Sequence, residues 1–159
     1  MREMDYVKIV KPSEEFYLVI DDYKKIVGDA LPNCKITLVG SFAIPMCGKE
    51  EFDLIVEVDD IEMAQKRIAE NSFGKIGIGP VIDGVGYCRS KKRLGIICEL
   101  HIMPFGHGKK KMCLRLIKKL QDNPALLKEY EKLKYSLDGK TKDIYRKKKG
   151  KFILDNDLI

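Results

Sequence analysis

A glycine-serine pair followed by an aspartate is the first candidate for chemistry in this chain. The segment Leu38-Val39-Gly40-Ser41 reads as the end of a strand and a bend, and Asp53 lies on the next apolar run. Gly40 lets the backbone approach a ligand closely, and N–H groups of the turn after it can point at an anion. Asp53 can supply an oxygen ligand to Mg2+, which proteins usually hold with one or two carboxylates plus the substrate's phosphates. The pattern predicts a phosphate site beside a metal ion.

Position 55 departs from this pattern. Two metal ligands on one face of a strand occupy positions i and i+2, and here these positions are Asp53 and Ile55. Isoleucine offers no ligand atom, so half of the expected pair is missing. Glu57 shares the face but lies about 13 Å from Asp53 at the rise of a strand. We therefore expect Glu57 to be solvated or paired rather than bound to the same ion.

A later strand offers a second carboxylate. Glu99 can join Asp53 in holding one divalent ion if their strands are neighbours, and His101 lies on the face of Glu99 one pleat further. A buried carboxylate without a partner is costly, which favours a site role for Asp53. The alternatives are an ion pair of Asp53 with Lys49 or another cation, and a hydrogen-bonded sheet histidine at position 101.

The remaining candidates are groups that bind phosphate. Ser41 offers its hydroxyl and its backbone N–H, although capping a turn explains it equally well. Charged and polar side chains that could ring the pocket as phosphate ligands are Lys49, Arg89, Lys134, Tyr145 and Lys149. For Lys134 and Lys149 the alternative is a solvated helix surface. His107 reads as a loop residue.

The elements that must position these residues follow from apolar spacing and from capping signals. Helices are predicted from Ser13 to about Gly28, from Asp59-Asp60 to about Asn71, and from Lys109 onward, with a new helix at Pro124 and a break at Asp138-Gly139. Strands are predicted over 35–39 and 52–58, and a hairpin pairs 82–89 with 94–103 across a polar turn at 90–93. The order predicts an α/β or α+β fold with a small mixed sheet and a helical C-terminal third.

Length and composition narrow the class of protein. The 159 residues suit one domain over 1–159, with a core at about 36–104 and C-terminal helices at about 109–153. A hydrophobic content of 45% argues against disorder. No apolar run reaches the roughly 20 residues of a membrane span, and no secretory signal is visible. Five cysteines without C-x-x-C spacing favour free thiols and a cytoplasmic protein.

Positive charge is concentrated near the C-terminus. Residues 105–151 carry 16 Lys/Arg against 5 Asp/Glu, while the whole chain has a net charge of +6. A solvated helical face explains this, and so does attraction for phosphorylated or acidic partners. The chain lacks the aromatic strand pattern that stacks single-stranded bases, so nucleic acid is the weaker expectation.

Several segments together resemble the GrpB-like family of the nucleotidyltransferase superfamily. The family pattern Gly-Ser-Thr-(Ser/Ala)-Val-Pro, then Lys-Pro-Ile-Ile-Asp, then His-Leu-His is similar to Gly40-Ser41-Phe42-Ala43-Ile44-Pro45, Lys49-Glu50-Glu51-Phe52-Asp53 and Glu99-Leu100-His101. Later helices are similar too, in Leu120-Gln121-Asp122-Asn123-Pro124, in Tyr130, Leu133 and Lys134, and in Tyr145, Lys149 and Phe152-Ile153. The resemblance covers about 36–153.

The resemblance implies a nucleotidyltransferase-like mixed sheet flanked by helices. For the superfamily it implies Gly-Ser, an Asp-x-Asp or Asp-x-Glu pair and a third carboxylate, which bind two metal ions that activate a hydroxyl and neutralise a triphosphate. Some members are fused to dephospho-coenzyme A kinase, which points to phosphorylated small molecules. Three functions follow as expectations: a Mg2+-dependent nucleotidyl or phosphoryl transferase, a nucleotide- or coenzyme A-binding module without turnover, and a protein that binds acidic partners through its basic helices.

Overall fold

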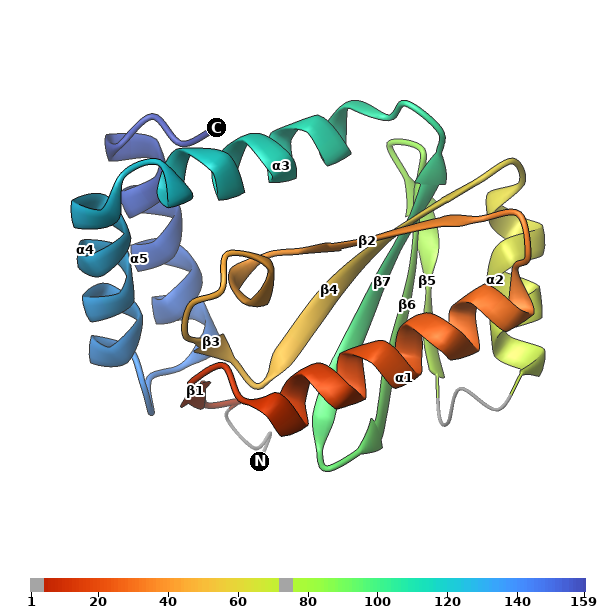
Figure 1. Ribbon diagram of the computed structural model, residues 1–159, viewed down its shortest axis with the longest axis horizontal. Helices are drawn as coiled ribbons and strands as arrows, with labels where there is room; N and C mark the ends of the chain where they lie inside the picture. Colours follow the sequence, from red (N-terminus) through yellow and green to blue (C-terminus); the bar gives the residue numbers. More distant parts are fainter. Residues whose placement is uncertain (1–4, 72–75) are drawn as a thin grey trace.

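A five-stranded mixed sheet forms the centre of the molecule (Figure 1). The computed structural model describes residues 5–71 and 76–159. The strands lie in the order β2 (Lys35–Val39), β4 (Glu51–Val58), β7 (Ile96–Pro104), β6 (Val85–Arg93) and β5 (Ile76–Ile82). β4 and β7 are parallel, and the other neighbours are antiparallel. The predicted mixed α/β architecture is confirmed.

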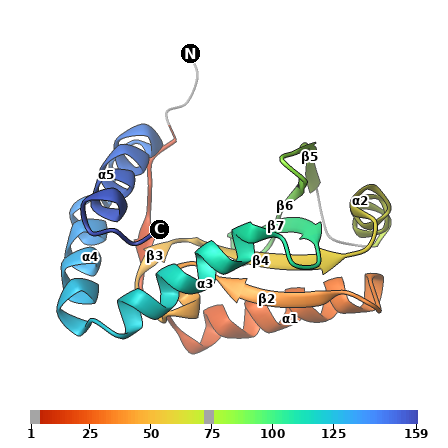
Figure 2. The same ribbon diagram turned by 90° about the horizontal axis from the view of Figure 1, so that it is seen from above.

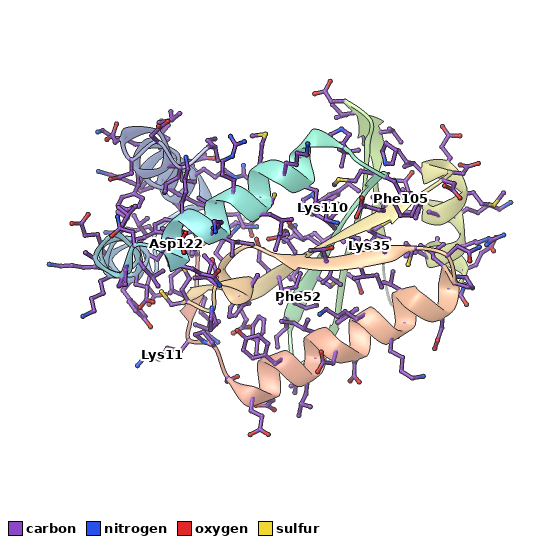
Figure 3. All side chains as sticks on the ribbon, turned by 45° about the horizontal axis from the view of Figure 1, so that its top comes forward. Lys11, Lys35, Phe52, Phe105, Lys110 and Asp122 are labelled. Carbon is purple, nitrogen blue, oxygen red and sulfur yellow. The ribbon has the colours of Figure 1, made fainter. Side chains whose placement is uncertain are left out.

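Two helices cover one face of this sheet. α1 (Glu14–Ala30) begins after Ser13, whose hydroxyl accepts a hydrogen bond from the N–H of Phe16, and α2 (Ile61–Glu70) begins after Asp60, which caps it in the same way. The apolar sides of both helices pack on alternate residues of β4 and β7, including Phe52, Leu54, Leu100 and Ile102. Figure 3 shows Phe52 between the sheet and α1.

Three helices form the C-terminal third on the other side. They are α3 (Gly108–Gln121), α4 (Pro124–Ser136) and α5 (Lys142–Asp155), and their N-caps are His107, Asn123 and Thr141. From above, α3 runs alongside the sheet and leads to the α4–α5 pair at one end of it (Figure 2). A second apolar cluster, which includes Ile55, Met103, Leu120 and Tyr130, joins these helices to the sheet.

An N-terminal segment, residues 5–10, connects the sheet end to the helices. Its strand β1 (Ile9–Val10) pairs with β3 (Gly48–Lys49). The N–H of Val7 donates to the carbonyl of Lys140, and the N–H of Gly139 donates to the carbonyl of Val7, both at 2.8 Å. The segment therefore holds β3, which carries Lys49, against the loop between α4 and α5.

The predicted hairpin turn is wrong in position. Residues 90–93 continue β6, and the chain reverses at Leu94 and Gly95, whose φ angles are 53° and 73°. Two successive residues with positive φ match the twist of a tight hairpin, which is the role that glycine fills most easily. The polar residues 90–93 predicted a turn, although they form the end of strand β6.

Ile55 belongs to the core rather than to a vacant ligand position. It has no exposed surface and packs in the second apolar cluster. Glu57, further along the same face, is 4% exposed and accepts hydrogen bonds from Lys110 at 2.5 Å and from the N–H of Gly106 at 3.3 Å. The expectation of a paired Glu57 is confirmed, and the interaction attaches the start of α3 to β4. Within residues 5–71 and 76–159, every helix is too short or too polar to span a lipid bilayer.

Replacing Ile55 with aspartate tests this assignment. A carboxylate at a fully buried apolar position leaves a charge without a partner, so Ile55→Asp should lower the free energy of unfolding by about 3–5 kcal/mol. Ile55→Val, the control, should cost about 0.5–1.5 kcal/mol. Urea unfolding followed by circular dichroism measures both. A variant Ile55→Asp as stable as the parent would place position 55 in the open site instead of the core.

Candidate functional site

A polar cavity of about 190 Å³ lies where β4 and β7 meet the C-terminal helices. Most of the residues predicted from sequence to form a site line it: Gly40, Ser41, Lys49, Asp53, Glu99, Tyr145 and Lys149. Three other predicted residues lie at its edges, since His101 contacts Asp53, Lys134 contacts Ser41, and Arg89 contacts Glu99. The chain thus brings all ten together from segments that are far apart in sequence.

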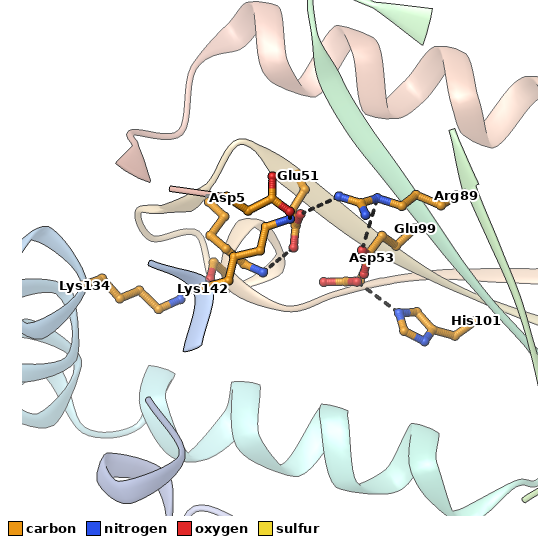
Figure 4. Close-up of polar contacts among 10 residues, drawn as sticks. Asp5, Glu51, Asp53, Arg89, Glu99, His101, Lys134 and Lys142 are labelled. Atoms are coloured by element: carbon orange, nitrogen blue, oxygen red, sulfur yellow. Dashed lines mark hydrogen bonds and ion pairs between the residues drawn. The ribbon is translucent and has the colours of Figure 1, made fainter. Parts of the chain in front are cut away.

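The acidic side of the cavity comes from two adjacent strands. Asp53 on β4 is the direct partner of Glu99 in the parallel ladder with β7, so the condition that their strands be neighbours is met. One ligand atom from each of Asp53, Glu99 and His101 lies within 4.8 Å of the other two. His101 Nε2 is 3.0 Å from Asp53 Oδ1. Figure 4 shows these side chains converging.

The pKa values of the two carboxyl groups are shifted in opposite directions. Burial opposes the ionisation of Asp53, but its hydrogen bond and charge interaction with His101 outweigh this and lower its pKa. Burial raises the pKa of Glu99, and the negative charges of Glu51 and Asp53 add to the increase, against a hydrogen bond from Tyr87. Of the two carboxyl groups, Glu99 is therefore the weaker acid, as expected for two carboxylates that lack a cation between them.

The basic side comes from α4 and α5. Lys134 is 1% exposed, and its ammonium donates a hydrogen bond to the hydroxyl of Ser41. Burial, together with repulsion from Lys149 and Lys49, lowers the pKa of Lys134 to about 7. The alternative interpretation of Lys134, a residue on a solvated helix surface, is therefore wrong.

Lys149 is a cation that faces the cavity without a partner. Within the described residues it forms no hydrogen bond or ion pair, and its ammonium lies 5.8 Å from the centre of the Tyr145 ring. Lys49 approaches the same ring at 5.3 Å. Burial, followed by repulsion from Lys49, lowers the pKa of Lys149. Lys149 is half-buried, so its ammonium has lost part of its hydration and an anionic ligand in the cavity would stabilise it.

Two glycines fix the bend that carries Ser41. Gly40 has a φ of 80°, and a Cβ there would lie 3.2 Å from Asp53 Oδ2. At Gly48 a Cβ would lie 2.8 Å from both Cβ and Oγ of Ser41. Position 40 thus needs glycine for backbone conformation and position 48 needs it for space. The need for glycine at position 40 was predicted from the sequence, and the need at position 48 was not.

Glu51 is a site residue that was not predicted from the sequence. It lines the cavity two residues before Asp53, on the same face of β4, with Lys49 Nζ 2.5 Å away and Arg89 Nη2 4.0 Å away. Lys49 therefore pairs with Glu51, and the alternative of an ion pair between Lys49 and Asp53 is wrong. The period of two that pointed forward to Ile55 also points back to Glu51, so the signal was present in the sequence.

A larger cleft adjoins the cavity. It has a volume of about 580 Å³ and shares Lys49 and Glu51 with the cavity. Arg89 lines this cleft, and its Nε lies 3.8 Å from Glu99 Oε1, at the boundary between the two spaces. The N-terminal segment forms another wall through Asp5, Tyr6, Val7 and Lys8.

Comparisons with known proteins agree with this fold. The model of the GrpB protein family matches residues 6–156. The crystal structure of the conserved protein GrpB from Enterococcus faecalis is similar with a TM-score of 0.71 and 21% identity, over 93% of this chain and 98% of that one. No curated protein has a matching sequence.

A poly(U) polymerase shares the fold more distantly. Two structures of Cid1, one with MgGTP bound and one described for its RNA terminal uridylyl transferase activity, are similar with TM-scores of 0.50 and 0.51. Their identities are 14% and 13%, over 79% of this chain. The chain spans under half of the Cid1 structures, 45% and 44%. At these identities the likeness concerns the fold.

The lowered pKa of Lys134 predicts a pH-dependent stability. Between pH values of about 7 and 10.5, Lys134 is neutral when folded and protonated when unfolded, so unfolding takes up a proton. The free energy of unfolding should therefore rise with pH in this window, by at most about 1.4 kcal/mol per pH unit from this group. Urea unfolding at several pH values should show a smaller slope for Lys134→Met. The control Lys132→Met, exposed on the same helix, should keep the parent slope, and equal slopes for all three proteins would contradict the burial of the Lys134 ammonium.

Proposed function

Because the chain belongs to the GrpB family and has a nucleotidyltransferase-like fold, we propose that it transfers a nucleotidyl or phosphoryl group with the help of a divalent metal ion, using a nucleotide or another phosphorylated small molecule. One observation carries the proposal. An adjacent pair of carboxylates and a half-buried lysine, Lys149, which has no anionic partner in the part of the chain that the structure describes, face the same small cavity. A phosphate with a bound cation satisfies both groups at once.

The lysines and the serine form the phosphate-binding side. Lys149 supplies a point charge, and Lys134 supplies another when a bound phosphate favours its protonated form. The hydroxyl of Ser41, already held by Lys134, supplies a further hydrogen bond. The bend at Gly40 and Gly48 brings the backbone close enough for a phosphate to reach Ser41. A bound anion also offsets the repulsion among Lys49, Lys134 and Lys149.

The carboxylates fit one metal ion. Asp53 and Glu99 are hard oxygen donors at adjacent ladder positions, and together with phosphate oxygens they suit Mg2+. When bound, the ion neutralises developing charge on the transferred group and its leaving group. Ile55 excludes the second half of a two-metal arrangement at this position of β4, since it is fully buried. The adjoining cleft, which shares Lys49 and Glu51 with the cavity, offers room for an acceptor.

The same observation at Ile55 favours a second candidate function. A protein that kept the phosphate-binding lysines and lost one carboxylate would bind a nucleotide or a coenzyme A-type ligand without turning it over. Glu51 does not replace the missing carboxylate in the ligand-free protein, because it already forms ion pairs with Lys49 and Arg89. The two candidates agree on binding and differ in turnover.

Calorimetric titration with ATP, GTP, CTP and UTP in the presence of Mg2+ tests the binding. We expect heat with at least one of the four, and we expect Lys149→Met to weaken that ligand by about 10–100-fold because a charged hydrogen bond to phosphate is lost. The matched control Lys148→Met, exposed on the same helix α5, should change affinity by less than about twofold. Absence of heat with all four nucleotides would count against the proposal.

Turnover separates the enzyme from the binding module. Asp53→Asn keeps the shape of the side chain and removes the charge that a metal requires. The enzyme hypothesis expects that, without its natural acceptor, the protein transfers the group slowly to water and releases phosphate or pyrophosphate from the nucleotide identified by titration. Asp53→Asn should lose about 100-fold or more of this rate, comparable with losing one strong electrostatic contact in the transition state. Binding with no release by the parent protein, at saturating nucleotide and metal, would leave the binding module as the function.

A further inference from the structure

His101 takes up the ladder position that lies directly beside Ile55. In the parallel pairing of β4 with β7, Asp53 is opposite Glu99 and Ile55 is opposite His101. A metal-binding side chain at position 55, two residues beyond Asp53, would point into the same region that the His101 side chain reaches from the neighbouring strand. The ligand that β4 lacks is therefore available from β7.

The three side chains form a compact set of donors. Oxygen atoms of Asp53 and Glu99 and a ring nitrogen of His101 all lie within 4.8 Å of one another, and all three side chains are partly exposed. They border the cavity in which Lys149 lacks an anionic partner among the described residues. The cluster thus combines two carboxylates with one imidazole, next to a space that favours a phosphate.

The contacts of the imidazole define its ligand-free state. Lys109, in the first turn of α3, places Nζ 3.2 Å from His101 Nδ1. Lysine ammonium can only donate, so Nδ1 accepts and the proton of a neutral ring is on Nε2, where it donates to Asp53. This N–H lies between the imidazole and a carboxylate, the place that a metal ion would take.

Imidazole changes which metal the site prefers. Oxygen-only sites suit Mg2+, whereas a nitrogen donor favours first-row transition ions such as Mn2+, Co2+ and Zn2+. We propose that Asp53, Glu99 and His101 together hold one divalent transition-metal ion, with His101 coordinating through Nε2. The inference rests on the metal role proposed above for the two carboxylates, and it assigns His101 to the metal rather than to phosphate.

Lys109 acts against this coordination. An imidazole bound through Nε2 carries its proton on Nδ1, and that N–H cannot face an ammonium. Lys109 therefore has to turn away when the metal enters. Its removal should favour the metal-bound form.

Metal binding without nucleotide tests the inference on the full chain. Titration of the protein with Mn2+ and Co2+, followed by Mn2+ electron paramagnetic resonance and the visible absorption of Co2+, gives affinities and identifies ligands. We expect pulsed resonance on bound Mn2+ to show coupling to an imidazole nitrogen. His101→Gln should abolish this coupling and weaken Co2+ by about tenfold or more, consistent with loss of a metal ligand, while changing Mg2+ affinity by less than about threefold.

Two variants serve as controls. His107→Gln removes the only other histidine of the chain and should keep both the coupling and the affinity. Lys109→Met should raise Co2+ affinity by about threefold or more, since it removes a competing charge at Nδ1. Circular dichroism confirms that each variant is folded, and nitrogen coupling in the parent protein is read independently of any variant.

The possible outcomes separate this inference from the proposed function. Bound Mn2+ without nitrogen coupling, or Co2+ affinity unchanged in His101→Gln, would overturn the role of His101 even if nucleotide binding to the lysines is observed. Nitrogen coupling that depends on His101 supports the inference even if none of the four nucleotides binds.

Discussion

The parallel pairing of β4 with β7 is the constraint on which the site depends. These strands are joined through α2, β5 and β6, yet their ladder sets Asp53 beside Glu99 and Ile55 beside His101. Because side chains alternate along a strand, a shift of one residue in either strand would move one carboxylate to the face covered by α1 and α2. The alternation of buried residues on the other face, including Leu54 and Leu100, prevents that shift. Packing on one face of the sheet thus positions the chemistry on the other.

The cavity has an acidic half from the sheet and a basic half from the C-terminal helices. Like charges repel within each half. The two carboxylates repel each other, and so do the lysines. Attraction across the space relieves part of this, because the charge of Asp53 favours the ionised forms of both Lys134 and Lys149. A phosphate bound with a cation would relieve the remaining repulsion in both halves, because the phosphate meets the lysines and the cation meets the carboxylates. Binding should therefore be linked, with each ligand improving the site for the other.

Local patterns predicted the elements because capping and period are local properties. Ser13, Asp60 and Pro124 mark helix starts that the structure confirms, and the alternation over β7 gave the faces of Glu99 and His101. The turn at Leu94-Gly95 was not predicted, because a leucine with positive φ has no clear sequence signal. The meaning of Ile55 also escaped, since burial depends on helices that begin over fifty residues later. Contacts such as that of Lys134 with Ser41 arise from tertiary packing, which no spacing in the sequence encodes.

The N-terminal segment, residues 5–10, forms a second connection between the sheet and the helical C-terminal third. The chain itself crosses from the sheet to the helical third at the β7–α3 connection, whereas residues 5–10 bridge the opposite end, from β3 to the loop before α5. The helical third is thus attached to the sheet at both ends. The cleft walled by Tyr6 and Lys8 shares Lys49 and Glu51 with the cavity, so the short segment that joins the two halves also forms a wall beside the lysines of α4 and α5, which follow it by more than a hundred positions.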